Sequence, residues 1–221
     1  MTDALINVNG STVNSLDILL LMTVLTLLPS MVVMMTSFTR YVVSFSFLRT
    51  AMGTQQTPPN LVLVGMALIL TLFTMTPTIN AIKESAYDPY KEGRITQEEF
   101  FERAQEPLKE FMLNQTEIRN MELYCNMTDT PIPQSQDEAR ELPMTVIMPA
   151  YVTSELKHAF IIGFLLYIPF LLIDIIVSST LMSMGMVMLP PSMISTPFKI
   201  LLFILLDGWQ LLFSTLVGMI R

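Results

Sequence analysis

The sequence has little charge, one cysteine and one histidine. Of its 221 residues, 14% are charged, whereas a soluble globular domain has about 25%. A single cysteine excludes a disulfide within the chain and a cluster of thiolate metal ligands. The net charge of −7 argues against nucleic-acid binding, which requires a basic surface. Because 52% of the residues are hydrophobic, the composition predicts a membrane protein.

The sequence also lacks the motifs that carry common enzyme chemistry. It contains no phosphate-binding loop, dinucleotide fingerprint, HExxH or GxSxG. His158 is the only histidine, and no nucleophile with a recognisable context lies near it. We therefore interpret His158 as a helix-end residue at the membrane surface. We expect no catalytic activity, no metal and no cofactor.

The charged residues are concentrated in one stretch. Residues 83–141 hold 7 basic and 14 acidic side chains, so the whole net charge of −7 belongs to this segment. We predict four regions from this distribution. They are an N-terminal segment (1–15), a first apolar hairpin (16–82), an acidic, mostly helical insert (83–148) and a second apolar hairpin (149–221).

Four apolar segments are long enough to cross a bilayer as helices, which takes about 20 residues. They lie at about 16–35, 61–79, 159–181 and 198–220. Prolines at 29 and 169 should kink the first and third segments. The pattern predicts an all-α integral membrane protein of helical hairpins with a helical insert.

Basic residues in short loops predict the orientation, because Lys and Arg accumulate on the cytoplasmic side. Arg40 and Arg49 lie in the connector 36–60, and Lys199 lies near the start of the last segment. We predict that both places are cytoplasmic, so the N-terminus and the insert lie outside, in the periplasm of a two-membrane bacterium. An outside N-terminus without basic residues suggests a removed signal peptide, although Met1 resembles an initiator.

The acidic insert carries a recognisable helix start. Thr96 and Glu99 form a capping-box sequence, in which each side chain satisfies a backbone donor of the other residue. The apolar residues that follow recur at three- and four-residue spacing: Phe100, Ala104, Leu108, Phe111 and Met112. This stripe is either a packing face for neighbouring subunits or a small local core. Residues 128–141, rich in Pro, Gln and acid, are predicted to form a loop.

A few charged residues fall in the apolar regions. A charge at a lipid-facing helix centre costs about 3 kcal/mol, so we predict that Arg40, Arg49, Asp174 and Asp207 pack inside protein or line a path. Asp174 and Asp207 leave one enzymatic alternative, an intramembrane aspartyl protease, because two facing carboxylates can share a proton. Neither follows the Gly-x-Gly pattern of such proteases.

Glu155 and Lys157 lie where the third apolar segment is expected to begin, next to the acidic insert. One interpretation is a solvated helix start, at which Glu is favoured by the helix dipole. The other is a pair of polar residues on a transport path.

Methionines alternate with small residues just before Pro190 and Pro191. They are Met182, Met184, Met186 and Met188, with Gly185 and Val187 between them. Gly185 and the two prolines favour a loop or a broken helix. Because methionine is unbranched and adaptable, several such loops could close a pore around varied cargo, although ordinary membrane-core filling is the alternative.

Six segments of the sequence are distinctive when taken together. They are 38–41 (FTRY), 47–60 (FLRTAMGTQQTPPN), 149–157 (PAYVTSELK), 168–174 (IPFLLID), 181–191 (LMSMGMVMLPP) and 207–209 (DGW). These segments resemble the FliP family of flagellar type III export-gate proteins and its injectisome counterparts. They occur in the family's order and together extend over about 16–212, so the resemblance is far more specific than one short motif.

The resemblance implies a gate subunit without catalysis. It implies bent helical hairpins and assembly in several copies with FliQ-like and FliR-like subunits and an FlhB-like switch protein, in the bacterial inner membrane and periplasmic side of the flagellar basal body. Unfolded flagellar subunits would pass through the channel, or virulence effectors if the chain belongs to an injectisome. Met184, Met186, Val187 and Met188 would form a pore gasket, although Val187 stands where relatives often have methionine. Glu155, with Lys157, would line or gate the pore.

Overall fold

The computed structural model describes residues 5–8, 11–54, 56–186 and 188–220. This part of the chain is helical apart from one hairpin of two short strands, so the predicted all-α class is confirmed with one addition. The hairpin pairs β1 (Leu5–Val8) with β2 (Ser11–Asn14) in antiparallel register. It was not predicted, because four-residue strands carry too little periodicity to be detected.

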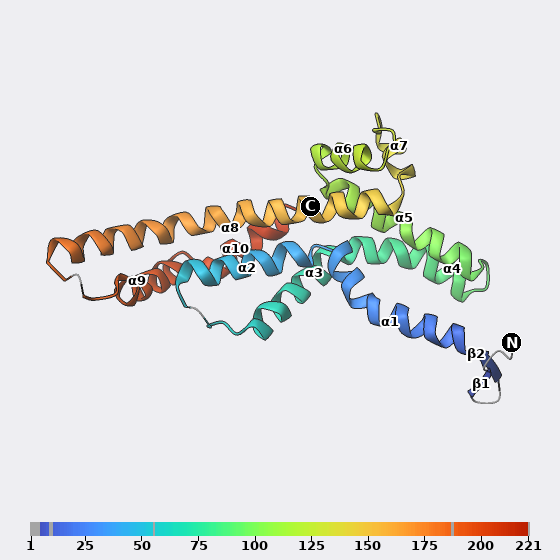
Figure 1. Cartoon of the computed structure of the whole chain (residues 1–221), viewed down its shortest axis with the longest axis horizontal. Coiled ribbons are helices and arrows are strands. Elements are labelled where there is room, and N and C mark those ends of the chain that lie inside the picture. Colours follow the sequence, from blue (N-terminus) through green and yellow to red (C-terminus); the bar gives the residue numbers. More distant parts are fainter. Residues whose placement is uncertain (1–4, 9–10, 55, 187, 221) are drawn as a thin grey trace.

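The first apolar region forms three helices. They are α1 (Ser15–Met35), α2 (Phe38–Met52) and α3 (Asn60–Ile82). α1 matches the predicted span 16–35, but the expected connector 36–60 is mostly helix. α2 ends at Gly53, whose φ of 73° is a left-handed conformation that glycine adopts without strain. The last turns of α1 meet α2 at 81°, and Figure 1 shows α1 leading away from the other helices.

α3 extends well beyond the predicted span 61–79. Pro77 lies inside it, and the chain continues through a π-helical turn, η1 (Lys83–Tyr87), into α4 (Asp88–Lys91). The boundary expected between the hairpin and the insert, at residues 82 and 83, therefore falls inside one continuous helical run. A π turn inserts one extra residue into a helix, which shifts the faces that follow it.

The insert continues as α5 (Gln97–Gln115), α6 (Ile118–Met127) and α7 (Gln136–Glu141). The capping box at Thr96 and Glu99 is confirmed. The loop prediction for 128–141 is wrong at its end, because the Ser135 side chain accepts the Glu138 backbone N–H and starts α7. The apolar stripe ends in a local core, in which Met112 packs with Met121 and Cys125. Burial raises the pKa of the Cys125 thiol.

The second apolar region contains α8 (Met144–Ser183), α9 (Pro191–Leu205) and α10 (Gly208–Gly218). The predicted third span is too short, since α8 begins at Met144 and keeps both Pro149 and Pro169 inside it. The predicted fourth span is broken. α9 and α10 meet at 64°, and Asp207 between them has a φ of 47°.

In the part of the chain that the structure describes, two helical runs are long and apolar enough to cross a membrane, namely Asn60–Lys91 and Met144–Ser183. The number rises to as many as four if the bent pairs α1–α2 and α9–α10 each count as one span. The four separate spans expected from hydropathy are therefore replaced by two long helical runs and two bent pairs.

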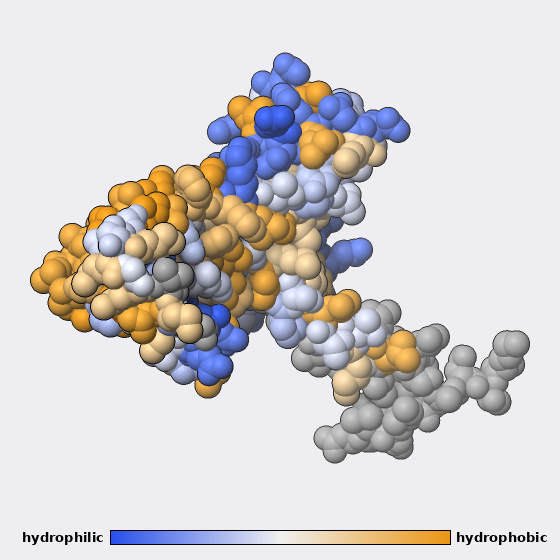
Figure 2. Space-filling view, turned by 60° about the vertical axis from the view of Figure 1, so that its left-hand side comes forward, coloured by the Kyte–Doolittle hydropathy of each residue, from blue (hydrophilic) through white to orange (hydrophobic). Residues whose placement is uncertain are grey.

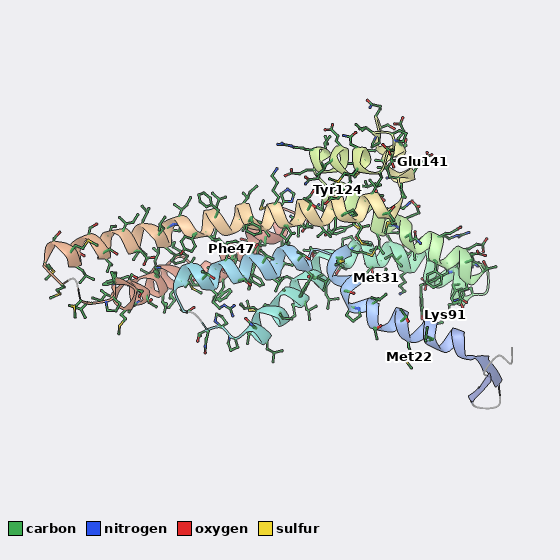
Figure 3. The ribbon with its side chains drawn as sticks, viewed as in Figure 1. Met22, Met31, Phe47, Lys91, Tyr124 and Glu141 are labelled. Carbon is green, nitrogen blue, oxygen red and sulfur yellow. The ribbon has the colours of Figure 1, made fainter. Side chains whose placement is uncertain are left out.

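The helices pack along α8. α2, α9, α5 and α6 all contact it, and Figure 1 shows α8 running from one end of the molecule to the insert. The ring of Phe47, labelled in Figure 3, lies against Gly163 of α8 so closely that a Cβ there would be 2.4 Å from ring atoms. This approach brings α2 and α8 close together.

The surface divides in the way that the charge distribution predicted. Figure 2 shows an apolar surface over the long helices and hydrophilic residues gathered on the insert. Large apolar side chains on α8 are exposed, among them Phe164, Leu172 and Ile176. Such a surface requires lipid or other protein to cover it.

The close approach at Gly163 gives a first test. We expect Gly163→Ala to lower the free energy of unfolding by about 1–3 kcal/mol, because the added methyl group overlaps Phe47. Gly65→Ala is the matched control, since a Cβ at position 65 of α3 meets nothing within 4 Å. The control should be neutral or raise stability by about 0.5–1 kcal/mol. Thermal unfolding of both variants in detergent measures the difference, and equal effects would contradict the packing.

Candidate functional site

A buried ion pair joins α2 to α8. Arg40 Nε donates to Glu155 Oε2 at 2.9 Å, and Arg40 Nη2 binds Glu155 Oε1. Both side chains are 1% exposed. This two-point contact uses the planar guanidinium on both carboxylate oxygens, which is the strongest arrangement available to such a pair.

The same guanidinium reaches two further elements. Arg40 Nη2 donates to Gln115 Oε1 at the end of α5, at 3.1 Å, and Gln115 Nε2 donates to the backbone oxygen of Ile220 at 2.9 Å. Arg40 Nη1 lies 3.5 Å from the backbone oxygen of Met219. The positive charge therefore lies near the carbonyl end of α10, where a cation is favoured. One residue thus links α2, α5, α8 and the segment after α10.

His158 extends the network toward the insert. Arginine can only donate, so His158 Nδ1 accepts from Arg40 Nη2 at 3.1 Å. His158 Nε2 then carries the proton and lies 3.5 Å from Glu117 Oε1. Lys157 pairs with the other oxygen of Glu117. The predicted location of His158 at a helix end is wrong, because it lies in the middle of α8 and is part of this network.

Glu155 and Lys157 also differ from the solvated helix start that was one interpretation. α8 begins eleven residues before Glu155, at Met144, and the Glu155 carboxylate is enclosed. Within this chain Glu155 therefore lies between helices and does not reach the surface. Lys157 is half exposed and binds the turn between α5 and α6.

Sequence reasoning missed Ser154, which fixes that turn to α8. The Ser154 hydroxyl accepts from the Glu117 backbone N–H at 3.0 Å and from Asn120 Nδ2 at 2.8 Å, and it donates to the Ala150 backbone oxygen at 2.8 Å. The available signal was helical spacing. Ser154, Glu155 and His158 fall on one side of α8, which marks a polar face on an otherwise apolar helix.

A second ion pair lies toward the other end of α8. Lys199 Nζ of α9 is 2.6 Å from Asp174 Oδ2 and 3.1 Å from the backbone oxygen of Ala51, near the end of α2. Lys199 is buried and Asp174 is partly buried. The ammonium therefore neutralises Asp174 and satisfies a carbonyl at the end of α2. Charge counting placed Lys199 at the cytoplasmic start of the last apolar segment, and the structure places it inside α9, which begins at Pro191.

The other two charges predicted to be buried are less enclosed. Arg49 is partly exposed and donates to Asn60 and to the Pro58 backbone oxygen, which closes the turn between α2 and α3. Asp207 is exposed at the bend between α9 and α10, so no burial of Asp207 occurs within this chain. Asp174 is bound to Lys199 rather than to a second carboxylate, which does not fit an aspartyl protease pair.

The methionine-rich segment forms the turn after α8. Gly185, with a φ of 76°, ends the helix, and the Met186 N–H returns to the Leu181 backbone oxygen at 3.0 Å. Met184 and Met188 are 68% and 96% exposed, and Met186 is also exposed. Val187 lies outside the described residues. The turn therefore presents thioethers to the outside of the chain, at the far end of its longest helix (Figure 1).

Within the described ranges, no group of three His, Cys, Asp or Glu side chains could hold a metal ion. The buried charges are paired, and the exposed groups at the turn are thioethers. These features define a class of protein, a helical membrane protein whose internal ion pairs hold an apolar turn at one end.

Comparison with known proteins places the chain within this class. Residues 21–216 match the model of the FliP family, and the chain belongs to that family. It is 47% identical over 216 residues to the flagellar biosynthetic protein FliP of Pectobacterium carotovorum, and the aligned region covers 98% of this chain and 83% of the relative. It is 47% identical over 204 residues to the protein of that name from Bacillus subtilis, covering 92% and 91%. The Aquifex aeolicus protein is 48% identical over 208 residues, covering 94% and 87%.

Proposed function

We propose that this chain is a core subunit of the flagellar type III protein export gate. Several copies, together with FliQ-like and FliR-like subunits and an FlhB-like switch protein, form a channel in the inner membrane and on its periplasmic side at the flagellar basal body. Unfolded flagellar subunits pass through this channel. The printed names of the relatives, all flagellar, support the flagellar system over an injectisome.

The observation that carries the proposal is the exposed methionine turn. Exposing the methionine side chains of this turn to water is unfavourable unless another apolar surface covers them. Equivalent turns from several copies supply that contact and form a soft apolar seal, because methionine adapts its shape to neighbours of different size. Met184, Met186, Val187 and Met188 are the residues assigned to this seal.

The ion pairs serve as supports in this proposal. Arg40 with Glu155 fixes α2 to α8, and Lys199 with Asp174 fixes α9 to α8 on the side nearer the turn. The turn between α8 and α9 is then held from both helices. Pairing these charges also offsets the free-energy cost of placing ionised groups at membrane depth. We assign no catalytic step to the chain, and transport energy comes from other components.

Deletion of the gene tests the proposal. We expect the source bacterium to lose swimming motility and to secrete no flagellin into the medium, because no gate subunit remains. A plasmid copy of the unchanged gene should restore both. Swimming assays and immunoblots of culture supernatants measure the result. Retained motility with loss of a secreted virulence effector would assign the chain to an injectisome, and retention of both secretions would reject the export function.

A further inference from the structure

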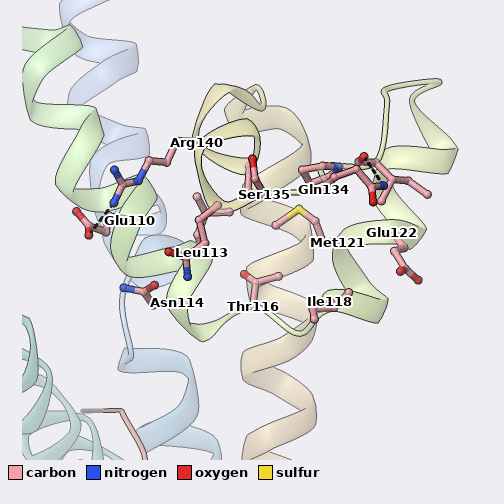
Figure 4. Close-up of a pocket in the computed structure, with 14 residues that line it drawn as sticks. Glu110, Leu113, Asn114, Thr116, Ile118, Met121, Glu122, Gln134, Ser135 and Arg140 are labelled. Atoms are coloured by element: carbon pink, nitrogen blue, oxygen red, sulfur yellow. Dashed lines mark hydrogen bonds and ion pairs between the residues drawn. The ribbon is translucent and has the colours of Figure 1, made fainter.

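A cavity of about 330 Å³ opens in the acidic insert, apart from the ion pairs and the methionine turn. Its walls come from the end of α5, the start of α6, the segment 132–135 and α7. Figure 4 shows Leu113, Thr116 and Met121 around the opening, with the Glu110–Arg140 ion pair at one side and Glu122 at the other. The volume lies at the lower limit of pockets that bind small ligands or single side chains, about 300–1,000 Å³.

Four large apolar side chains contribute to the lining of the cavity, together with polar ones. They are Leu113, Ile118, Met121 and Ile132. Ile118 is 78% exposed, although the insert around it is hydrophilic (Figure 2). An apolar recess surrounded by polar residues is typical of a binding site rather than of a scattered surface side chain.

The net charge around the cavity is negative. Residues 109–141, which include its walls, contain three basic and seven acidic side chains. Arg140 is neutralised by Glu110 at 3.1 Å. Glu122 forms no ion pair within the part of the chain that the structure describes. The rim therefore carries uncompensated negative charge, which favours a cationic partner.

We propose that this cavity binds a peptide segment of another protein, in which a Leu or Phe side chain is flanked by Lys or Arg. The apolar side chain enters between Leu113 and Met121, and the basic neighbour pairs with Glu122. Asn114 and Gln136 also line the cavity, and their amide side chains can bond the peptide backbone. This assignment goes beyond the export channel, because it gives the insert a partner of its own.

The test uses the full chain in nanodiscs of zwitterionic lipid, so that basic peptides have no anionic membrane to bind. The probe is a fluorescent peptide with the core Lys-Leu-Phe-Lys, and fluorescence anisotropy measures its dissociation constant. The comparison peptides have the cores Glu-Leu-Phe-Glu and Lys-Ser-Ser-Lys. We expect binding of the first peptide alone, and weaker binding as salt is raised.

Matched variants locate the binding. Ala139→Trp fills the cavity and should weaken binding at least tenfold, whereas Gln105→Trp, on an exposed part of α5 away from the cavity, should leave it unchanged. Glu122→Gln should weaken binding about two- to five-fold at low salt, the range expected for an exposed ion pair. Glu102→Gln is its control. Ile118→Ser, at a solvent-exposed position, gives a second cavity variant if Ala139→Trp does not fold.

Several results would overturn the proposal. They are equal binding of the acidic peptide, no effect of either cavity variant, or no binding at all. A photoreactive amino acid at position 118 provides an independent check. Crosslinking to a second copy of this chain would make the cavity a contact between copies and would reject a basic peptide as its occupant. Since these measurements do not depend on secretion, their failure leaves the export function standing.

Discussion

Replacing Arg40 with Met is expected to lower the free energy of unfolding by roughly 3–5 kcal/mol, the usual cost of leaving one partner of a buried ion pair alone. The carboxylate of Glu155 would remain enclosed with no cation beside it. Gln115 and His158 would lose a donor as well. We expect little folded protein in membranes and a strongly lowered melting temperature in detergent, measured by fluorescence-detected size exclusion after heating.

The control for this variant is Arg49→Met. Arg49 is partly exposed and bonds only to the adjoining turn, so its loss should cost about 1 kcal/mol. A double variant, Arg40→Met with Glu155→Leu, should recover much of the lost stability, because removing both charges leaves neither unpaired. If Arg40→Met and Arg49→Met were equally mild, the pair would not be a structural joint.

Replacing Met186 and Met188 with Ala is expected to make the membrane permeable to ions and small molecules. Each change shortens an exposed side chain at the turn, and the loss is multiplied by the number of copies that meet there. We expect a several-fold rise in the uptake of a membrane-impermeant dye, because an apolar constriction blocks water only while it remains narrow. Uptake is measured in cells that also produce the partner subunits.

Met22→Ala and Met31→Ala provide the matched control for the leak. Both residues are exposed methionines on α1 (Figure 3), so the chemical change is the same but the place is different. They should leave permeability unchanged. If the turn variant is present in the membrane in normal amounts and dye uptake is the same as with the original protein, the gasket assignment is rejected.

Features that depend on neighbouring residues could be predicted from the sequence. The capping box at Thr96 and Glu99 needs contacts only three residues apart, and its sequence signature is complete. The first apolar segment and α1 agree almost residue for residue. Ser135 and Glu138 carry a similar helix-start signal, which the surrounding Pro and Gln concealed.

Features that depend on residues far apart in the sequence could not be predicted in this way. The charge of Glu155 favoured a solvated position, and nothing near it in the sequence shows that Arg40 lies opposite. The break between α9 and α10 involves packing over a shorter range. Gly208 lies so close to the Phe203 ring that a Cβ would be 2.2 Å from it, a contact that hydropathy does not register. Hydropathy located the four apolar segments, but it gave the third one too short and did not divide the fourth.

The separation of Arg40 and Glu155 along the chain also sets an order of events during synthesis. The two residues are 115 positions apart, and a ribosome adds about 5–20 residues per second. Arg40 therefore waits for roughly 6–23 s before its partner exists. During that interval the Arg40 cation lacks the carboxylate that pairs with it in the folded chain. The joint between α2 and α8 therefore forms only after α8 has been made, so the first half of this chain completes its folding only after the second half has been made.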